Sequence, residues 1–318
     1  RLLGAVIETH PPAEGAEVTS EANPGTADAE KFAAMSKAGF NRLSLGAQSF
    51  QSHDLIQLGR VHEANDVARA VKTARDAGFE NINLDLMFAL PGQSERAWRN
   101  NLDIAFSLKP EHLSLYCLTI EPNTRFYKYA HRGMLDLPGE ESQVRMYDDA
   151  CELAQANGYA QYEISNFAKA GHECRHNLCY WRGEEYLAYG PGAVGCFRSP
   201  LPSNRDESCT ARREGQGVGP LRTRYTVSKH PERYCQAVES GVDTWFETET
   251  LDAETLALER LMLGVRLNEG LSLDATPLDS AGLKRVRANG WIEPDERVLR
   301  LTKIGRHFCT EVVARIAT

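Results

Sequence analysis

The amino-acid sequence predicts an α/β fold in which a partial (β/α) barrel is followed by a C-terminal winged-helix-like α+β module. Three observations lead to this prediction. Strand and helix patterns alternate between residue 17 and about residue 120, the strands repeatedly carry one polar face, and helices followed by a hairpin pattern close the chain. Strands separated by helices of this length indicate right-handed crossovers and a parallel sheet.

Composition and charge limit the class of protein and its partners. The chain has 318 residues, of which 42% are apolar and 25% are charged, and its formal charge is −8. This mixture is typical of a soluble globular protein, and the negative charge disfavours binding to nucleic acid. We find no apolar stretch long enough for a transmembrane segment and no signal peptide. Eight scattered cysteines do not resemble the disulfide framework of a small secreted domain, so we expect a cytoplasmic location.

The predicted elements of the barrel follow in order. A helical pattern over residues 1–9 stops before Pro11 and Pro12, because the residue before a proline avoids the helical region. A chain that begins inside a helix is expected to have lost an earlier part, so we expect a barrel that is incomplete at its N-terminus. Strands are predicted over residues 17–22, 42–48, 81–89 and 112–120. Helices are predicted between them, near residues 28–38, 67–77 and 94–107.

The first three predicted strands each present two different faces, of which one is repeatedly polar, since side chains alternate along a strand. The more apolar face carries Val18, Ser20 and Ala22 in the first strand, Leu43, Leu45 and Ala47 in the second, and Ile82, Leu84 and Leu86 in the third. The opposing sets are Thr19, Glu21 and Asn23; Ser44, Gly46 and Gln48; and Asn83, Asp85 and Met87. A parallel sheet covered by helices on both faces would be apolar on both.

A barrel explains this asymmetry, because its apolar face packs on outer helices while the other face points inward. Polar groups at the carboxyl ends of the strands then meet at one mouth, where the active sites of barrels lie. We therefore predict that Glu21, Gln48 and Asp85 line a functional mouth. The alternative is an open sheet with a solvated edge, which explains one polar strand more easily than three.

The remaining chain divides into two further parts. A helix over 140–158, a strand over 161–167, a loop over 199–219, a strand over 223–228 and a helix over 232–239 are predicted first. From residue 251 onward, we predict helices over 255–267, 283–288 and 303–316 and a β-wing over 291–301. The predicted domains are therefore 1–125, 126–250 and 251–318. Winged-helix modules often bind DNA, but the acidic charge favours a substrate lid or a partner surface.

The densest chemical cluster is His172-x-Cys174-x-His176-x-x-Cys179, followed by Tyr180 and Trp181. A zinc site is one interpretation, but no second pair of ligands follows at a useful distance. Four ligands within eight residues would also be difficult to arrange tetrahedrally. A structural loop is the second interpretation, and the residues alone leave it open.

Four segments together resemble a known family, the radical S-adenosylmethionine (radical SAM) proteins of the oxygen-independent coproporphyrinogen III oxidase and HemW-type haem chaperone group. The segments are Glu21-Ala22-Asn23-Pro24-Gly25, Asn41-Arg42-Leu43-Ser44-Leu45-Gly46-Ala47-Gln48-Ser49-Phe50, Leu58-Gly59-Arg60-Val61-His62 and Asn83-Leu84-Asp85-Leu86-Met87-Phe88-Ala89-Leu90-Pro91-Gly92. Each alone is a weak signal, but four in order with compatible gaps are specific. The resemblance covers most of the chain.

The resemblance implies S-adenosylmethionine and a [4Fe–4S] cluster as cofactors of a radical-SAM partial barrel. By position in the family motifs, Glu21, Gln48, Arg60 and Asp85 are the expected contacts of S-adenosylmethionine. Three cysteines in a C-x-x-x-C-x-x-C motif hold the cluster in the family, and this chain contains no such motif. We therefore expect an N-terminally truncated chain in which no residue binds the cluster metal.

The segment from Arg175 to Trp181 resembles the H-N-x-x-Y signature of the chaperone branch. His176 and Tyr180 are residue types that can ligate haem iron, and the resemblance makes them the expected haem-binding residues. The family's glycine-rich loop often carries a histidine where this chain has Val194, so a second haem ligand is not expected there.

The function implied is a haem chaperone that binds haem, or a related porphyrin, and transfers it to acceptor proteins. The alternative is an oxygen-independent coproporphyrinogen III oxidase, which forms protoporphyrinogen IX by radical oxidative decarboxylation. A third and weaker hypothesis is an unrelated barrel lyase that uses Glu21 and Asp85 as acid and base. Whether the protein is an enzyme therefore stays open at this point.

Overall fold

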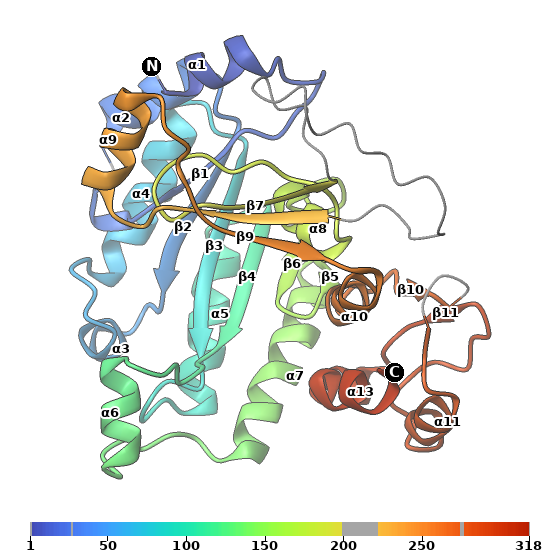
Figure 1. The fold of residues 1–318 in the computed structure, drawn as a ribbon. Helices are drawn as coiled ribbons and strands as arrows, with labels where there is room; N and C mark the ends of the chain where they lie inside the picture. Colours follow the sequence, from blue (N-terminus) through green and yellow to red (C-terminus); the bar gives the residue numbers. More distant parts are fainter. Residues whose placement is uncertain (1, 27, 199–221, 274–276, 318) are drawn as a thin grey trace, which may run out of the picture. The chain divides into compact units, whose positions relative to one another are not determined.

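The structure is a computed structural model that describes residues 2–26, 28–198, 222–273 and 277–317. The chain forms two compact units, residues 1–175 and residues 176–318 (Figure 1). No helix among these described residues is long and apolar enough to cross a membrane.

Unit 1 carries the alternating strands and helices that the sequence predicts. Its elements are α1 (Leu2–Thr9), β1 (Thr19–Ala22), η1 (Pro24–Thr26), α2 (Ala29–Lys37), β2 (Arg42–Gln48), α3 (Ser52–Gln57), α4 (Ala64–Asp76), β3 (Asn81–Phe88), α5 (Glu95–Ser107), β4 (His112–Cys117), α6 (Arg125–His131), α7 (Glu140–Ala156), β5 (Ala160–Glu163) and β6 (Asn166–Ala168). The four predicted barrel strands and the three helices between them are confirmed, with ends that differ by a few residues.

One six-stranded sheet, in the order β1-β2-β3-β4-β6-β5, organises unit 1. The pairs β1–β2, β2–β3 and β3–β4 are parallel, as predicted, and β6 joins β4 in the antiparallel direction. The register places Glu21 beside Ser44, Ser44 beside Asn83 and Asn83 beside His112. These four side chains therefore form one row across the polar face of the sheet.

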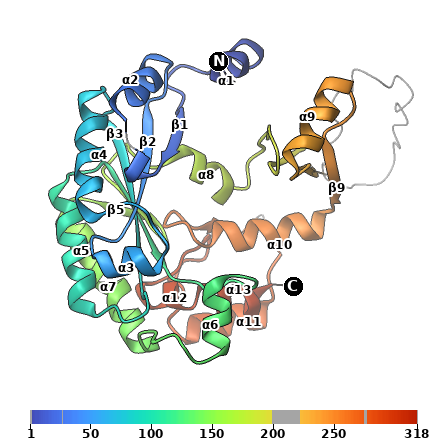
Figure 2. The ribbon, with the colours of Figure 1, turned by 90° about the vertical axis from the view of Figure 1, so that its left-hand side faces the viewer.

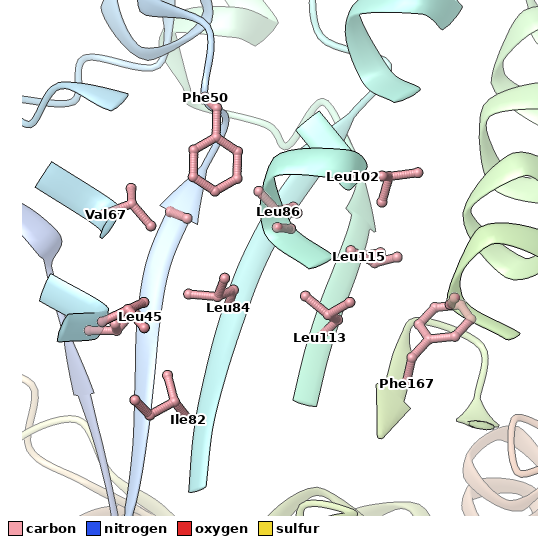
Figure 3. Packing of buried hydrophobic residues seen from close by; sticks show 14 of the residues in the cluster. Leu45, Phe50, Val67, Ile82, Leu84, Leu86, Leu102, Leu113, Leu115 and Phe167 are labelled. Carbon is pink, nitrogen blue, oxygen red and sulfur yellow. The ribbon is translucent and has the colours of Figure 1, made fainter. Parts of the chain in front are cut away.

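The apolar face of this sheet carries the core of unit 1. Leu43, Leu45, Ile82, Leu84 and Leu113 are fully buried, and they pack against α2, α4, α5 and α7 (Figures 2 and 3). In α5 the buried positions are Trp98, Asn101, Leu102 and Ala105, which is the spacing of one helix face. The Oγ of Ser94 caps this helix by accepting from the amide of Ala97. Sequence alternation thus decides which face of the sheet is covered.

Unit 2 combines a three-stranded sheet with a small helical module. Its elements are α8 (Arg175–Trp181, which begins at the last residue of unit 1), β7 (Val194–Arg198), β8 (Arg222–Val227), α9 (Pro231–Ser240), β9 (Trp245–Leu251), α10 (Ala253–Gly264), β10 (Leu271–Ser272), α11 (Ser280–Ala288), β11 (Val298–Leu299), α12 (Lys303–His307) and α13 (Cys309–Ile316). The strands β7, β8 and β9 are antiparallel. The predicted wing is also present, since Ile292 pairs with Leu301 and β10 pairs with β11.

The structure corrects two predicted elements. Residues 161–167 do not form one strand but a hairpin, because the Oε1 of Glu163 accepts from the amide of Ser165 and the side chain of Asn166 and so stabilises a turn. The predicted last helix is two helices, interrupted at Phe308, whose backbone leaves the helical region at φ −111° and ψ 22°. The predicted loop over 199–219 lies outside the described residues, and the three-domain division stays a prediction.

We expect Leu84→Ala to destabilise unit 1 by about 2–5 kcal/mol, because a fully buried leucine leaves a cavity among residues that cannot collapse around it. Urea denaturation followed by circular dichroism measures this loss. Ile56→Ala is the matched control, since Ile56 is 74% exposed, and we expect a change within about 0.5 kcal/mol. A loss below about 1 kcal/mol for Leu84→Ala would show that this face is not the core.

Candidate functional site

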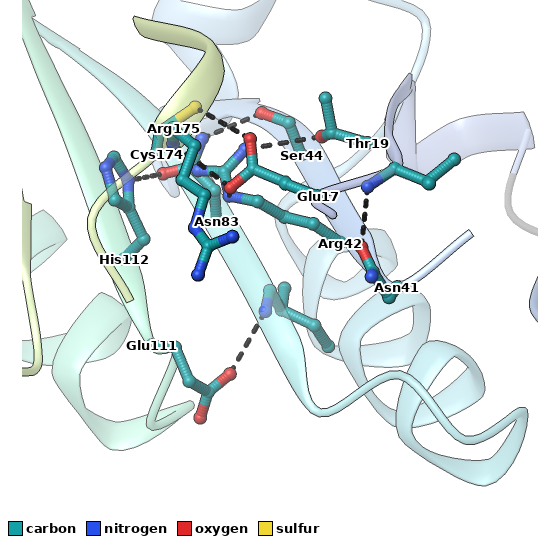
Figure 4. A network of polar contacts seen from close by, with 12 residues as sticks. Glu17, Thr19, Asn41, Arg42, Ser44, Asn83, Glu111, His112, Cys174 and Arg175 are labelled. Atoms are coloured by element: carbon teal, nitrogen blue, oxygen red, sulfur yellow. Dashed lines mark hydrogen bonds and ion pairs between the residues drawn. The ribbon is translucent and has the colours of Figure 1, made fainter. Parts of the chain in front are cut away.

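The amide of Asn83 is the centre of a hydrogen-bond network on the polar face of the unit 1 sheet (Figure 4). Its nitrogen donates to the Oγ of Ser44 at 2.7 Å and to Asp85 at 2.8 Å. Its oxygen accepts from the Nδ1 of His112 at 2.6 Å and from the Oγ of Ser114 at 3.2 Å. An amide has two N–H donors and two acceptor lone pairs, so every hydrogen-bonding position of Asn83 is used.

This network also determines the tautomer of the buried His112. The carboxylate of Asp85 can only accept, which turns the nitrogen of Asn83 toward it and the oxygen of Asn83 toward His112. The Nδ1 of His112 must then donate, and in the neutral ring Nε2 accepts from the hydroxyl of Tyr162 at 2.9 Å. Burial, together with the charges of Arg42 and His172, holds the pKa of His112 well below its usual range. His112 is therefore a neutral, oriented part of the face.

Asp85 lies half-buried in the middle of the network. Both of its oxygens accept hydrogen bonds, from Asn83 at 2.8 Å and from Ser44 at 3.1 Å. Burial raises the pKa of Asp85 in spite of these hydrogen bonds, and the charge of Glu21 on the neighbouring part of the face raises it further. The predicted site residues Glu21 and Asp85 are thus electrostatically coupled. A cation or a set of hydroxyl donors bound here would relieve that repulsion.

Gln48 ends β2 in a strained conformation. Its φ of 63° lies in the left-handed region, which costs a residue with a side chain about 1–2 kcal/mol. The register between β2 and β3 also shifts between Leu45 and Gln48. The side-chain amide lies over Gly46, where an added Cβ would be 2.8 Å from Nε2. The bulge, together with the absence of a Cβ at Gly46, allows the buried side-chain amide of Gln48 to lie over Gly46 at the end of the strand.

Two sets of contacts hold this strained turn in place. The Oγ of Ser49 donates to Asp54 at 2.6 Å and accepts from Asn101, and the oxygen of Asn101 accepts from the amide of Phe50. On the other side, the Nε2 of the buried His62 contacts the carbonyl of Ala47 at 3.2 Å. Strain of this kind persists only where surrounding contacts enforce it, and it concentrates at functional sites.

Arg60, the remaining predicted contact of the cofactor, lies on the exposed loop that follows α3. Its charge contributes to the lowered pKa of His62, after the larger effect of burial. Arg60 is thus near the residue that supports the turn at Gln48. Unlike Ser44, Asn83 and Asp85, it is not joined to the network by a hydrogen bond among the described residues.

The end of unit 1 contacts the amino-terminal edge of the same polar face. The carboxylate of Glu17 accepts from the Sγ of Cys174 at 3.6 Å and from the amide of Arg175 at 3.2 Å (Figure 4). It also lies 3.8 Å from the Nε of Arg42. Cys174 therefore contacts a carboxylate. The described residues contain no group of three or more His, Cys, Asp or Glu side chains that could hold a metal ion.

In unit 2 the predicted haem residues lie together on α8. The rings of His176 and Tyr180 meet edge to face with centroids 4.8 Å apart, and Tyr180 meets Tyr186 in the same way at 4.6 Å. His176 is exposed and Tyr180 is half-buried. Burial raises the pKa of Tyr180 and of Cys179, so both side chains resist ionisation. Tyrosine and cysteine side chains lose a proton when they bind a metal ion, and burial opposes that loss in Tyr180 and Cys179. The imidazole of His176 can bind a metal ion in its neutral form.

Sequence reasoning missed the part of the site that β4 supplies. His112, Ser114 and Tyr116 alternate with the apolar Leu113 and Leu115, so the same period of two that identified Asp85 also marks them. The alternation also placed Asn83 on the polar face, but its central role could not be predicted, because that role depends on the register between strands.

Comparison with known families divides the chain into two matched regions. Residues 3–105 match the model of the radical SAM superfamily, and residues 251–308 match the model of the HemN C-terminal domain. The first region contains Glu21, Gln48, Arg60 and Asp85. The second contains α10, α11 and the wing.

The curated relatives include several proteins named haem chaperone HemW. The chain is 36% identical to that of Bacillus subtilis over 313 residues, which is 95% of this chain and 76% of the relative. It is 41% identical to that of Escherichia coli over 228 residues, or 72% of this chain and 58% of the relative. Among solved structures, coproporphyrinogen III oxidase (HemN) from Escherichia coli matches with a TM-score of 0.76 at 18% identity, over 99% of this chain and 73% of that one. This last similarity shows the fold alone.

We expect Asp85→Asn to raise the midpoint of thermal unfolding of the ligand-free chain at pH 8. A raised pKa in the folded state means that folding opposes the ionised carboxylate, so the cost is present at high pH and disappears as the pH falls toward 3.8. The variant should therefore lose its advantage as the pH is lowered. A gain of 1 kcal/mol corresponds to about 2–4 °C for a domain of this size.

Asp103→Asn is the control for this measurement, because it makes the same change of charge at an exposed position of α5. Thermal unfolding is followed by circular dichroism at pH 8 and pH 5. If Asp85→Asn lowered the midpoint at pH 8, the hydrogen bonds to the carboxylate would outweigh its burial, contrary to our interpretation.

Proposed function

Because this chain belongs to the HemW family of haem chaperones within the radical SAM superfamily, we propose that it binds haem and transfers it to acceptor proteins. The observation that carries the proposal is the H-N-x-x-Y segment on α8, where the exposed imidazole of His176 packs against Tyr180, which in turn packs against Tyr186. Haem needs a ligand for its iron and flat apolar surface for its ring. We further propose a cytoplasmic location, in keeping with the number and scatter of the cysteines along the chain.

His176 is the residue that we propose as the iron ligand. A neutral imidazole nitrogen binds haem iron directly, whereas Tyr180 and Cys179 would first have to ionise, and burial opposes this in both. Tyr180 then has a different role, as a ring that packs against the porphyrin. The exposure of His176 allows a large flat ligand to reach it.

For S-adenosylmethionine we propose the polar face of unit 1. Glu21 and Asp85 would accept hydrogen bonds from the ammonium and ribose hydroxyl groups, and Gln48 would both donate and accept. Arg60 would pair with the carboxylate of the cofactor. When bound, S-adenosylmethionine supplies the radical chemistry of the superfamily. The half-buried Asp85 and the turned amide of Gln48 fit a ligand of this polarity.

The residues present do not fit a [4Fe–4S] cluster, because iron–sulfur clusters need thiolate ligands and this chain holds no C-x-x-x-C-x-x-C motif. No reaction step is therefore assigned through a cluster. Oxidation of coproporphyrinogen III is the rival activity, and the match to the solved structure of that oxidase, at 18% identity, shows the fold alone. In a turnover assay on a form of the protein that carries the cluster cysteines, a carrier should bind haem without decarboxylating coproporphyrinogen III, whereas formation of protoporphyrinogen IX would favour the oxidase.

We expect His176→Ala to abolish or shift the Soret band of haem bound to the chain and to weaken binding by about tenfold or more. The midpoint of thermal unfolding should stay nearly unchanged, since His176 is exposed. Titration of the apoprotein with haem, followed by absorbance, measures both the spectrum and the affinity.

Two further variants make the assignment specific. His230→Ala removes an exposed histidine of the same unit and should leave the spectrum unaltered. Tyr180→Phe keeps the ring, so haem affinity should change little if the tyrosine packs rather than ligates. An unaltered Soret band in His176→Ala would refute the ligand assignment, and a band lost only in Tyr180→Phe would assign the iron to the phenolate.

A further inference from the structure

A pocket of about 480 Å³ in unit 2 is lined by an unusual number of arginines. It lies where the end of α8, the strands β7 and β8 and the helix α10 meet. Its lining residues are Arg182, Gly183, Arg198, Arg222, Ala253, Leu256, Ala257, Glu259, Arg260 and Leu263. Pockets of this size hold small-molecule ligands. Four guanidinium groups in one pocket are notable in a chain whose formal charge is −8.

The charges of this pocket do not balance. Arg182 is paired with Glu269 through two bonds of 2.9 Å, and Arg198 is paired with Glu185 at 2.7 Å. Glu259, the one carboxylate among the described lining residues, is held by Arg224 through bonds of 2.6 and 2.7 Å.

The two other arginines have no carboxylate partner among the described residues. Arg222 donates to the carbonyl of Gly183, which carries no charge. Arg260 is exposed, and its side chain makes no hydrogen bond or ion pair within the part of the chain that the structure describes. Two guanidinium groups are thus available to a ligand with two acidic groups. Guanidinium groups recognise planar carboxylates through paired hydrogen bonds.

Strand register places this pocket beside the aromatic residues of α8. Arg198 lies opposite Arg222, and Cys196, two residues earlier in β7, pairs with Tyr186. Side chains two residues apart share a face, so Tyr186 lies on the face of the sheet that carries the arginines. Tyr186 in turn packs against Tyr180.

Helix α8 also ends beside the arginine pocket. Arg182 directly follows the last residue of α8, six residues and about 9 Å along the axis from His176. Together with the packing of Tyr186 against Tyr180, this places the arginine pocket at the C-terminal end of the helix that carries His176.

We propose that this arginine pocket binds the two carboxylate side chains of haem, with Arg222 and Arg260 as their charge partners. This inference rests on the proposed function, because it takes the ligand of unit 2 to be haem. It adds the group that orients the ring: the imidazole holds the centre of the ligand, and the guanidinium groups hold one edge.

Haem and haem dimethyl ester, whose two carboxylates are blocked, distinguish this inference from the function on which it rests. Each is titrated into the full chain and into Arg222→Gln, Arg260→Gln and the control Arg233→Gln, which removes an exposed arginine of α9 outside the pocket. We expect haem to bind each pocket variant about tenfold more weakly than the unaltered chain. The control variant should match the unaltered chain. The ester should bind the unaltered chain and all variants with similar, weaker affinity.

The possible results distinguish a failure of this inference from a failure of the proposed function. If haem binds but the ester binds equally well, or if the pocket variants match the control, the inference is wrong and the proposed function stands. If Arg233→Gln weakens binding as much as Arg260→Gln, the effect is one of general charge and the pocket has no special role. If haem does not bind the unaltered chain at all, the proposed function fails, and the inference fails with it. Arg260 has no described partner, so its substitution tests binding even if Arg222→Gln alters the fold.

Discussion

The fully used amide of Asn83 is the interaction on which the polar face of unit 1 depends. It joins three strands, because its partners are Ser44 on β2, Asp85 on its own strand and His112 and Ser114 on β4. Each partner is oriented by the N–H donor or the oxygen acceptor that Asn83 presents to it. A buried amide that lost one of these partners would leave a polar group without a hydrogen bond, at a cost of about 1–3 kcal/mol. The network is therefore satisfied as a whole, and it positions the neutral His112 and the ionisable Asp85 together.

Both units hold groups that the fold alone does not favour. In unit 1 these are the carboxylate of Asp85, opposed by burial and by Glu21, and the left-handed backbone of Gln48. In unit 2 they are the like charges of Arg222 and Arg260 in one pocket. A protein selected for stability alone would replace such groups, whereas a binding protein keeps them because its ligand supplies the missing partner. This common feature links the proposed S-adenosylmethionine site with the proposed haem site.

The sequence predicted much of the fold because local patterns suffice where one face of an element is buried. The strands β1 to β4, their parallel direction and their polar face all follow from the alternation of residues such as Leu43, Ser44 and Leu45. Contacts between distant residues were not predictable in this way. The central place of Asn83 depends on strand register, and the arginine pocket joins residues from three elements and from the segment that follows α8.

Two local features without a periodic pattern of apolar residues were also not predicted. The turn between β5 and β6 depends on two hydrogen bonds accepted by Glu163, which no periodicity reveals. The strand β9, with its exposed alternating Glu and Thr residues, lacks the apolar face by which strands are identified. The family resemblance named Glu21, Gln48, Arg60, Asp85, His176 and Tyr180. Their roles as ligand contacts stay predictions, and the structure adds the residues that orient them.

A carbon-13 NMR titration of the Asp85 side-chain carboxyl carbon tests most directly whether the polar face holds an ionised group at the expense of stability. The signal is assigned by comparison with Asp85→Asn, and the ligand-free chain is titrated over the range in which it stays folded. Burial and the charge of Glu21 should place the pKa of Asp85 above its ordinary value of 3.8. A measured pKa at or below 3.8 would mean that the hydrogen bonds from Ser44 and Asn83 outweigh burial. The polar face would then be a stable structural network that favours no ligand.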